Sequence, residues 1–154
     1  MNSYKVFFQT LIDELRTKHK FTNAKMGQPQ SWYHFSTGVK GLTYAVCFSR
    51  NEKVRTEIYI DTGKAEDNKN IFRKLENQKQ SIEKEFGAEL DWQILENKRA
   101  SRIAIYREGS IYEDTTALIE IKDWSIEQLL TFKKVFAQRL SETTIEEIRD
   151  KIEE

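Results

Sequence analysis

The stretch SWYHFSTGVKGLTYAVCFSRNEKVRTEIYID, residues 31–61, contains three runs in which apolar and polar side chains alternate. Such alternation predicts β-strands, here over 31–36, 42–49 and 54–61. Short connections join antiparallel neighbours, so the three runs are expected to form a meander. The middle run shows the pattern most clearly, because every second residue is apolar: Leu42, Tyr44, Val46 and Phe48. A sheet with one apolar and one polar face is covered by helices on one side only.

Helical patterns flank this meander, with apolar residues recurring three or four positions apart. The predicted helices span 6–18, 64–86, 124–140 and a short charged segment within 141–154. Two further predicted strands span 90–95 and 101–107, joined by a turn, and 109–116 is predicted as a loop. Ser3 is a candidate cap of the first helix, Asp123 or Ser125 of the third, and Gly87 is expected to end the second.

The order of the predicted elements is α-βββ-α-ββ-α(α). Strands cluster without strict βαβ alternation, which indicates an α+β fold: a single antiparallel sheet of about five strands with helices packed mainly on one face. A chain of 154 residues, 12% of them aromatic, is long enough for one core and most economically forms a single domain over 1–154.

Composition excludes several classes of protein. The mean hydropathy is −0.69 and no apolar run approaches the length that crosses a bilayer. The N-terminus lacks the pattern of a signal peptide, so we expect a cytoplasmic protein without a membrane partner. The single cysteine, Cys47, excludes an internal disulfide. Nucleophilic catalysis by Cys47 would need His19 or His34 beside it, and a mid-strand cysteine among small residues is more simply a packing residue.

The charges are unevenly distributed along the chain. Residues 1–60 carry nine Lys/Arg and four Asp/Glu, whereas 61–154 carry sixteen and twenty-one. No acid occurs between Glu14 and Glu52, and aromatic residues are interleaved with the basic ones there. This composition suits a phosphate-bearing partner, although a basic half docked on an acidic half of the same domain would also explain it. The candidate ligand-binding residues of this window are Lys25, Gln28, Gln30, Trp32, Tyr33 and His34.

A second group of candidates lies further along the chain. Lys98, Arg99 and Arg102 belong to a basic cluster on a turn and a strand, where they either contact phosphate or form a solvated surface. The polar sheet face carries Arg55, Glu57, Tyr59, Asp61 and Arg102, which form structural charge pairs or line a site. Asn68 falls on the apolar stripe of the second helix and is expected to be a cap or to bond a loop backbone. Which face of the first strand is buried stays open.

Metal and nuclease chemistry form an alternative. One cysteine and two histidines cannot by themselves supply a zinc site, so no metal is expected on that basis. The pattern E-x-K, which with further acids can hold Mg²⁺ in nucleases, occurs twice. The residues of this alternative are Asp61, Asp91, Glu96, Lys98, Glu120 and Lys122. In a chain that is 32% charged, the pattern is also expected by chance.

The segment FTNAKMGQPQSWYHFSTGVKGLTYAVCFSR resembles an uncharacterised prokaryotic domain family of unknown function. The similarity continues through VRTEIYID, DNKNIF, ELDWQIL, KRASRIAIYR and WSIEQLLTFKKVFAQRL, and so covers about residues 4–140. Domains of that family often follow restriction-endonuclease-like regions in longer proteins, which implies a role near DNA processing or genome defence. The resemblance implies no catalytic residues.

Together these observations favour a non-enzymatic accessory or binding domain, without a cofactor, that contacts nucleic acid or a nuclease partner. The alternatives are a Mg²⁺-dependent nuclease and a protein-interaction or dimerisation module that uses the exposed sheet face.

Overall fold

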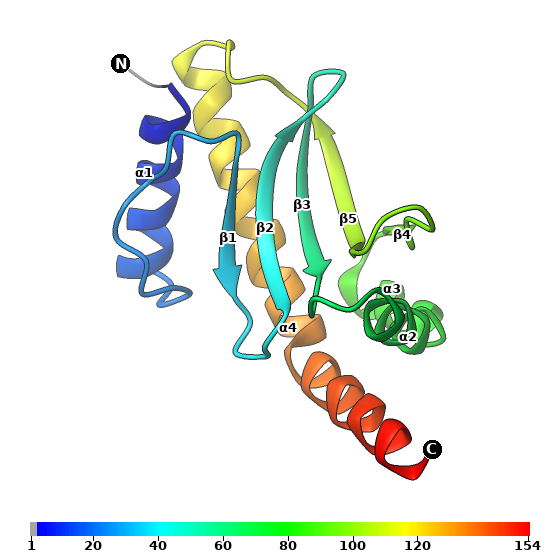
Figure 1. Cartoon of the computed structure of the whole chain (residues 1–154). Coiled ribbons are helices and arrows are strands. Elements are labelled where there is room, and N and C mark those ends of the chain that lie inside the picture. Colours follow the sequence, from blue (N-terminus) through cyan, green and yellow to red (C-terminus); the bar gives the residue numbers. More distant parts are fainter. Residues whose placement is uncertain (1–2) are drawn as a thin grey trace.

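A computed structural model of the chain describes residues 3–154. Within these residues, five strands form one antiparallel sheet with the order β1-β2-β3-β5-β4 (Figure 1). The strands are β1 (Trp32–Ser36), β2 (Leu42–Ser49), β3 (Lys53–Ile60), β4 (Asp91–Gln93) and β5 (Ser101–Glu108). The predicted α+β fold, with the first three strands as a meander, is confirmed.

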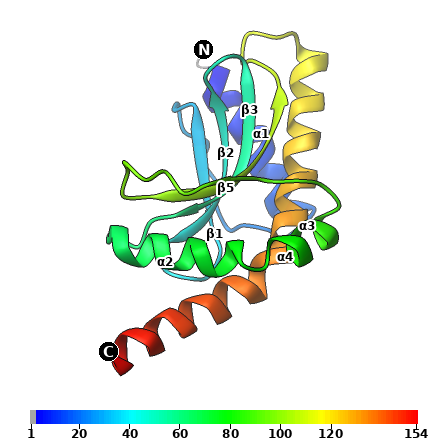
Figure 2. The same ribbon diagram turned by 90° about the vertical axis from the view of Figure 1, so that its right-hand side faces the viewer.

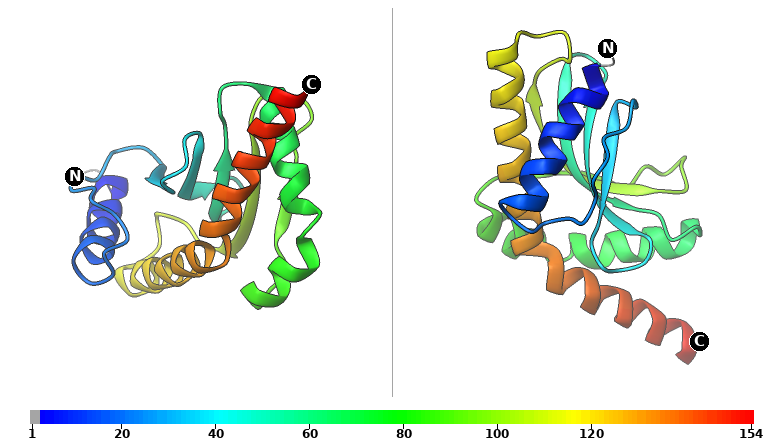
Figure 3. Two further views of the ribbon diagram at one scale, coloured as in Figure 1. Left: turned by 90° about the horizontal axis from the view of Figure 1, so that it is seen from below. Right: turned by 90° about the vertical axis from the view of Figure 1, so that its left-hand side faces the viewer.

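Helices cover one face of this sheet. α1 (Ser3–Thr17) and the first part of α4 (Thr115–Glu153) lie side by side behind it, as the views from below and from the side show (Figures 2 and 3). The apolar stripe of α1 is buried there, because its residues recur at the helical period: Phe7, Phe8, Leu11, Ile12 and Leu15. Among the described residues, no helix of comparable extent covers the opposite face of the sheet, which faces the viewer in Figure 1.

Alternation along β1 settles which of its side chains are buried. Phe35 is buried and Tyr33 packs against the core, with its ring centroid 5.0 Å from that of Phe35. Trp32 and His34 therefore lie on the uncovered face, and 47% of Trp32 is exposed. The uncovered face is called the open face below.

The helix predicted over 64–86 is two helices, α2 (Ala65–Glu76) and α3 (Lys79–Phe86). The last turn of α2 tightens, because the amide of Gln78 donates to the carbonyl of Leu75, three residues earlier, at 2.9 Å. The chain then turns and α3 directs Ile82 into the core. Gly87 ends α3 as predicted, with a φ of 87° and its amide donating to Glu83.

The predicted start of the last helix is wrong. α4 begins at Thr115, and its cap is Asp114, whose carboxylate accepts from the amide of Ala117 at 2.9 Å. Ser125 does not cap a helix, because it lies inside α4 and its hydroxyl donates to the carbonyl of Ile121 at 2.8 Å. No glycine or proline occurs after Gly109, so the sequence has no helix-breaking residue between Thr115 and Ser125.

The separate helix predicted for the C-terminus is also wrong, because α4 continues through it to Glu153 (Figure 1). The C-terminal part of α4 packs on α2 with its polar side and not with its apolar side. Asn70 donates to the buried carboxylate of Glu147 at 3.0 Å, and Lys151 pairs with Asp67. Three isoleucines on the other side are exposed: Ile145, Ile148 and Ile152. None of the helices in residues 3–154 has an apolar stretch long enough to cross a membrane.

Candidate functional site

The open face is organised in rows that run across the strands. Register places Trp32 opposite Cys47, Cys47 opposite Arg55 and Arg55 opposite Tyr106. The next row contains His34, Ala45, Glu57 and Ala104. Because neighbouring strands lie about 4.8 Å apart, the side chains of one row lie beside one another.

A cleft of about 750 Å³ occupies this face between the β2–β3 hairpin and the β4–β5 hairpin. Five basic residues line it, and no acidic residue does: Arg50, Lys53, Arg55, Lys98 and Arg102. The remaining lining residues are Tyr4, Ser31, Cys47, Phe48, Ser49, Asn51 and Tyr106. This is called the basic cleft below. Its charge is far more one-sided than the chain, whose net charge is zero.

Glu57 supports the basic cleft from beneath. Its Oε2 lies 3.0 Å from the Nε of Arg55 and 2.8 Å from the Nε of Arg102, and its side chain is 3% exposed. Both Nε–H groups nevertheless lack a well-directed hydrogen bond, so the contacts hold mainly by charge. Burial raises the pKa of Glu57, and the two guanidinium groups oppose that shift. Two positive charges share one carboxylate, which leaves an excess positive charge at the floor of the cleft.

Neutral side chains hold Arg102 in place. Its Nη1 lies 3.4 Å from the Oε1 of Gln93, and the Nε2 of Gln93 donates to the hydroxyl of Tyr106 at 2.7 Å. The guanidinium also lies over the ring of Tyr59, 6.0 Å from its centroid. A guanidinium with fixed position loses little entropy when it binds an anion.

The other basic groups differ in how far they are neutralised. Lys53 forms an ion pair with the exposed carboxylate of Glu108. Within residues 3–154, Arg50 and Lys98 have no carboxylate or hydrogen-bond partner for their side chains. These two charges are available to an anion at no cost in broken ion pairs.

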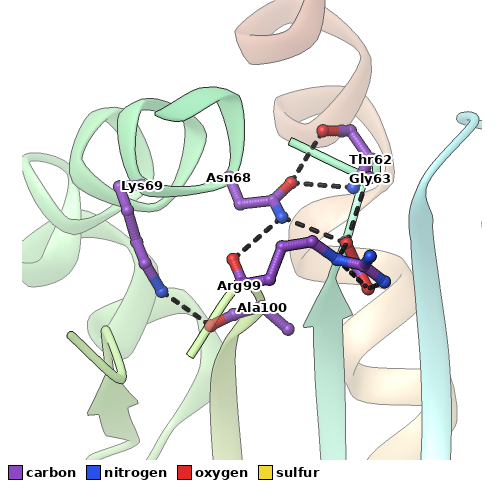
Figure 4. Close-up of polar contacts among 7 residues, drawn as sticks. Thr62, Gly63, Asn68, Lys69, Arg99 and Ala100 are labelled. Atoms are coloured by element: carbon purple, nitrogen blue, oxygen red, sulfur yellow. Dashed lines mark hydrogen bonds and ion pairs between the residues drawn. The ribbon is translucent and has the colours of Figure 1, made fainter. Parts of the chain in front are cut away.

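The β4–β5 hairpin, which carries Lys98, is fastened to α2 by two buried polar side chains (Figure 4). The Nζ of Lys69 donates to the carbonyls of Ile94 at 2.6 Å and Ala100 at 2.7 Å, and also to Leu95 and Ser101. Burial lowers the pKa of Lys69. Lys69 was not among the predicted residues, because a lysine on a charged helix gives no sign of burial.

Asn68 forms hydrogen bonds with loop backbone, which was one of the two roles predicted for it, the other being a helix cap. Its Nδ2 donates to the carbonyl of Arg99 at 3.0 Å, and its Oδ1 accepts from the amide of Thr62 at 2.7 Å (Figure 4). Arg99 in turn binds Asp61 in two places, with Nε–Oδ1 at 2.9 Å and Nη2–Oδ2 at 2.7 Å. Those hydrogen bonds with Arg99 lower the pKa of Asp61. Arg99 therefore attaches the β4–β5 hairpin to Asp61, whereas Lys98 and Arg102 line the cleft.

The predicted residues of the acid-free window separate into two groups. Trp32 and His34 lie on the open face, whereas Tyr33 points to the core. His34 contacts the hydroxyl of Thr43 through its Nδ1 at 2.7 Å, and burial followed by the charge of Arg55 lowers its pKa. The other three are exposed in the segment before β1: Lys25, Gln28 and Gln30. None of these three lines the basic cleft.

The residues of the nuclease alternative are dispersed over several elements. Asp61 is bound to Arg99, Glu96 lies 3.9 Å from Arg73, and Asp91 is exposed on β4. Glu120 and Lys122 lie on α4, behind the sheet, where Lys122 pairs with Glu14 of α1 at 3.0 Å. In the part of the chain that the structure describes, no three His, Cys, Asp or Glu residues are grouped so as to hold a metal ion.

Of the cleft residues that the sequence did not select, Arg55 had a signal in the sequence pattern, whereas Arg50 and Lys53 had none. Arg55 was placed on the polar sheet face by alternation, but its role depended on whether charges there pair or bind. Arg50 and Lys53 flank the β2–β3 turn, and only the approach of the β4–β5 hairpin makes them walls of a cleft. Burial raises the pKa of the Cys47 thiol, which lines the same cleft, so this cysteine is not an activated nucleophile.

No curated protein and no solved structure matches this chain. A family model described as a domain of unknown function, DUF4268, matches residues 3–140. The match includes all five strands of the sheet and α4 as far as Leu140, and so covers the whole basic cleft. The chain therefore belongs to the DUF4268 family of domains of unknown function.

Proposed function

We propose that this domain is a non-enzymatic nucleic-acid-binding module that contacts the phosphate backbone with its basic cleft. The observation that carries this proposal is that five basic residues and no acid line one cleft on the open face. Arg50 and Lys98 lack ionic partners within residues 3–154, and Arg55 and Arg102 share a single carboxylate. A phosphodiester offers the charge that this arrangement lacks.

The proposal extends to a biological setting. The resemblance of the sequence to domains that follow restriction-endonuclease-like regions supports an accessory role in a restriction or genome-defence system. In such a system, this domain would supply contacts with nucleic acid, and a nuclease on another chain or region would cut. The basic cleft supports this division of roles, because it provides phosphate contacts without a group of acids for a catalytic metal among the described residues.

Fluorescence anisotropy of labelled oligonucleotides tests the proposal. Single-stranded and duplex DNA and RNA are titrated with the protein at about 50 mM and about 200 mM salt. We expect binding at low salt that weakens at high salt, because bound phosphates release counterions. Lys98→Glu and Arg50→Glu should each weaken binding to every sequence and reduce the salt slope by about 1 or more.

Lys134→Glu is the matched control, because Lys134 is exposed on α4, on the other side of the sheet, and has no ionic partner among the described residues. It makes the same charge change outside the cleft and should leave affinity nearly unchanged. Absence of binding at low salt, or equal losses in the Lys98 and Lys134 variants, would show that the cleft is not a nucleic-acid site.

A further inference from the structure

We infer that the nucleic acid taken by the basic cleft is single-stranded, with one base stacked on Trp32 and the neighbouring phosphate at Arg55 and Arg102. This inference rests on the proposed function and specifies the ligand class of the same site. Three observations support it: Trp32 lies close to the basic cleft, its ring has no partner among the described residues, and the open face has a recess rather than a projecting helix.

Trp32 lies in the same row of the sheet as Arg55, one of the basic residues of the cleft. It stands opposite Cys47, which lines the cleft, and Arg55 follows on the next strand. Two strand spacings separate the backbones of Trp32 and Arg55 by about 10 Å. Both side chains project from the same face of the sheet. A nucleotide whose base lies on Trp32 can therefore place a phosphate at the wall of the cleft.

Among the described residues, Trp32 is the aromatic ring of the open face without a polar or ring partner. Tyr59 is covered by Arg102 and meets His34 edge to face, with centroids 5.3 Å apart. The hydroxyl of Tyr106 is bonded to Gln93. An exposed tryptophan alone would mean little, because single exposed apolar residues are common. Beside Arg55, which shares the single carboxylate of Glu57 with Arg102, it completes the pairing of a ring and a basic group that binds unpaired bases.

The shape of the open face favours a single strand over a duplex. In a duplex, the bases are stacked on one another, so a protein reaches only their edges, usually by inserting a helix or a two-stranded ribbon into the major groove. The two longest helices, α1 and α4, lie behind the sheet and not on the open face (Figure 3). The open face instead offers a recess of about 750 Å³ beside a flat ring. Only an unpaired base has a free face to place on that ring.

A competition experiment tests this inference with three unlabelled ligands of equal length: a DNA single strand, the matching duplex, and a strand in which the bases are replaced by abasic sites. We expect the wild-type protein to prefer the single strand to both others by about fivefold or more. Trp32→Ala should lower affinity for the single strand by a similar factor and leave affinity for the abasic strand unchanged. Trp32→Phe should retain most of the preference, because a ring is kept. A base stacked on Trp32 should quench tryptophan fluorescence when the wild type binds, and this quenching should be lost in Trp32→Phe.

Ile148→Ala serves as the control, because Ile148 is an exposed apolar residue on the last turns of α4. It should change none of the three affinities. If the duplex binds as tightly as the single strand, or if Trp32→Ala weakens the abasic strand equally, the inference is wrong. In that case the proposed function stands as long as Lys98→Glu weakens binding. If none of the three ligands binds at low salt, both the inference and the proposed function are wrong.

Discussion

The Nε of Arg102 lies 2.8 Å from the Oε2 of Glu57, a carboxylate whose side chain is 3% exposed on the uncovered face of a sheet. Glu57 also contacts Arg55, 3.0 Å away. One buried acid thus positions two arginines whose outer parts line the basic cleft. Coulomb attraction is strong at this depth, but it is offset by the cost of burying the charges. The arrangement is therefore costly to break, even though it adds little net stability.

Glu57→Gln should strongly destabilise the fold. The change leaves two partly buried guanidinium groups without their counter-charge, and removal of one partner of a buried ion pair typically costs about 3–5 kcal/mol. Urea unfolding followed by circular dichroism measures the loss. Glu108→Gln is the control, because Glu108 also forms an ion pair, with Lys53, but its side chain is 79% exposed, so the loss should stay below about 1 kcal/mol. Equal losses in the two variants would contradict the role given to Glu57.

Asp61 should make stability depend on pH in the acidic range. Its hydrogen bonds with Arg99 hold its pKa below the ordinary value of 3.8. The unfolded chain thus takes up this proton at a higher pH than the folded protein does. The contribution of Asp61 to stability is fully present above the ordinary pKa and is lost as pH falls through the lowered pKa of the folded state.

Urea unfolding at a series of pH values from about 5 to about 2 measures this dependence. Asp61→Asn should flatten the acid limb of the stability profile relative to the wild type. Asp91→Asn removes an exposed acid that has no ionic partner among the described residues, and it should leave the shape of the profile nearly unchanged. An acid limb that is identical in the wild type and in Asp61→Asn would disprove the role of this pair.

Lys69→Met should loosen the β4–β5 hairpin. The substitution keeps much of the side-chain volume but removes the Lys69 donor from the buried carbonyl of Ala100, at about 1–3 kcal/mol for a group left unpaired. The carbonyl of Ile94 loses one of its two donors and keeps the hydroxyl of Ser101. Hydrogen exchange of the amides in 94–100 should accelerate more than that of β2. Because Lys98 lies in this segment, affinity for nucleic acid should also fall. Lys64→Met, at an exposed position just before α2, should change neither measurement.

Asp114→Ala should destabilise the protein by about 1 kcal/mol, because Asp114 caps α4 through the amide of Ala117. Asp123→Ala should cost less than about 0.5 kcal/mol, because Asp123 is an exposed residue within the helix. Thermal unfolding of the two variants distinguishes a helix that begins at Thr115 from one that begins near residue 124. A larger loss in the Asp123 variant would mean that α4 begins later.

The sequence predicted the sheet well and the ends of the helices less well, for one reason. Alternation in 31–61 is a property of neighbouring residues, and each strand shows it independently of the rest of the fold. Helix boundaries depend on which of several capping residues is used. Asp123 and Ser125 matched a capping pattern, but the apolar residues before them, Leu118 and Ile121, also pack against the core and extend the helix. Tertiary packing overrode the local signal.

The candidate site was predicted in part. Trp32, His34, Lys98 and Arg102 were selected from two separate segments of the sequence, and the fold places all four on the open face. Arg99 was selected with them, but a carboxylate 38 residues away binds it. Arg50 and Lys53 were not selected, because their place beside Lys98 depends on two hairpins that are distant in the chain.

The sequence by itself thus determined the α+β class, the three-stranded meander and the segregation of polar from apolar side chains, all of which follow from periods of two or 3.6 residues. Only the tertiary structure decided which charges are neutralised and which remain free. An ion pair depends on the distance between two side chains in space, and that distance has no counterpart in sequence spacing. Arg99 meets Asp61 and Arg102 meets Glu57, whereas Lys98, the residue just before Arg99, meets no acid among the described residues. That difference, set by the pairing of β3 with β5, makes the open face basic.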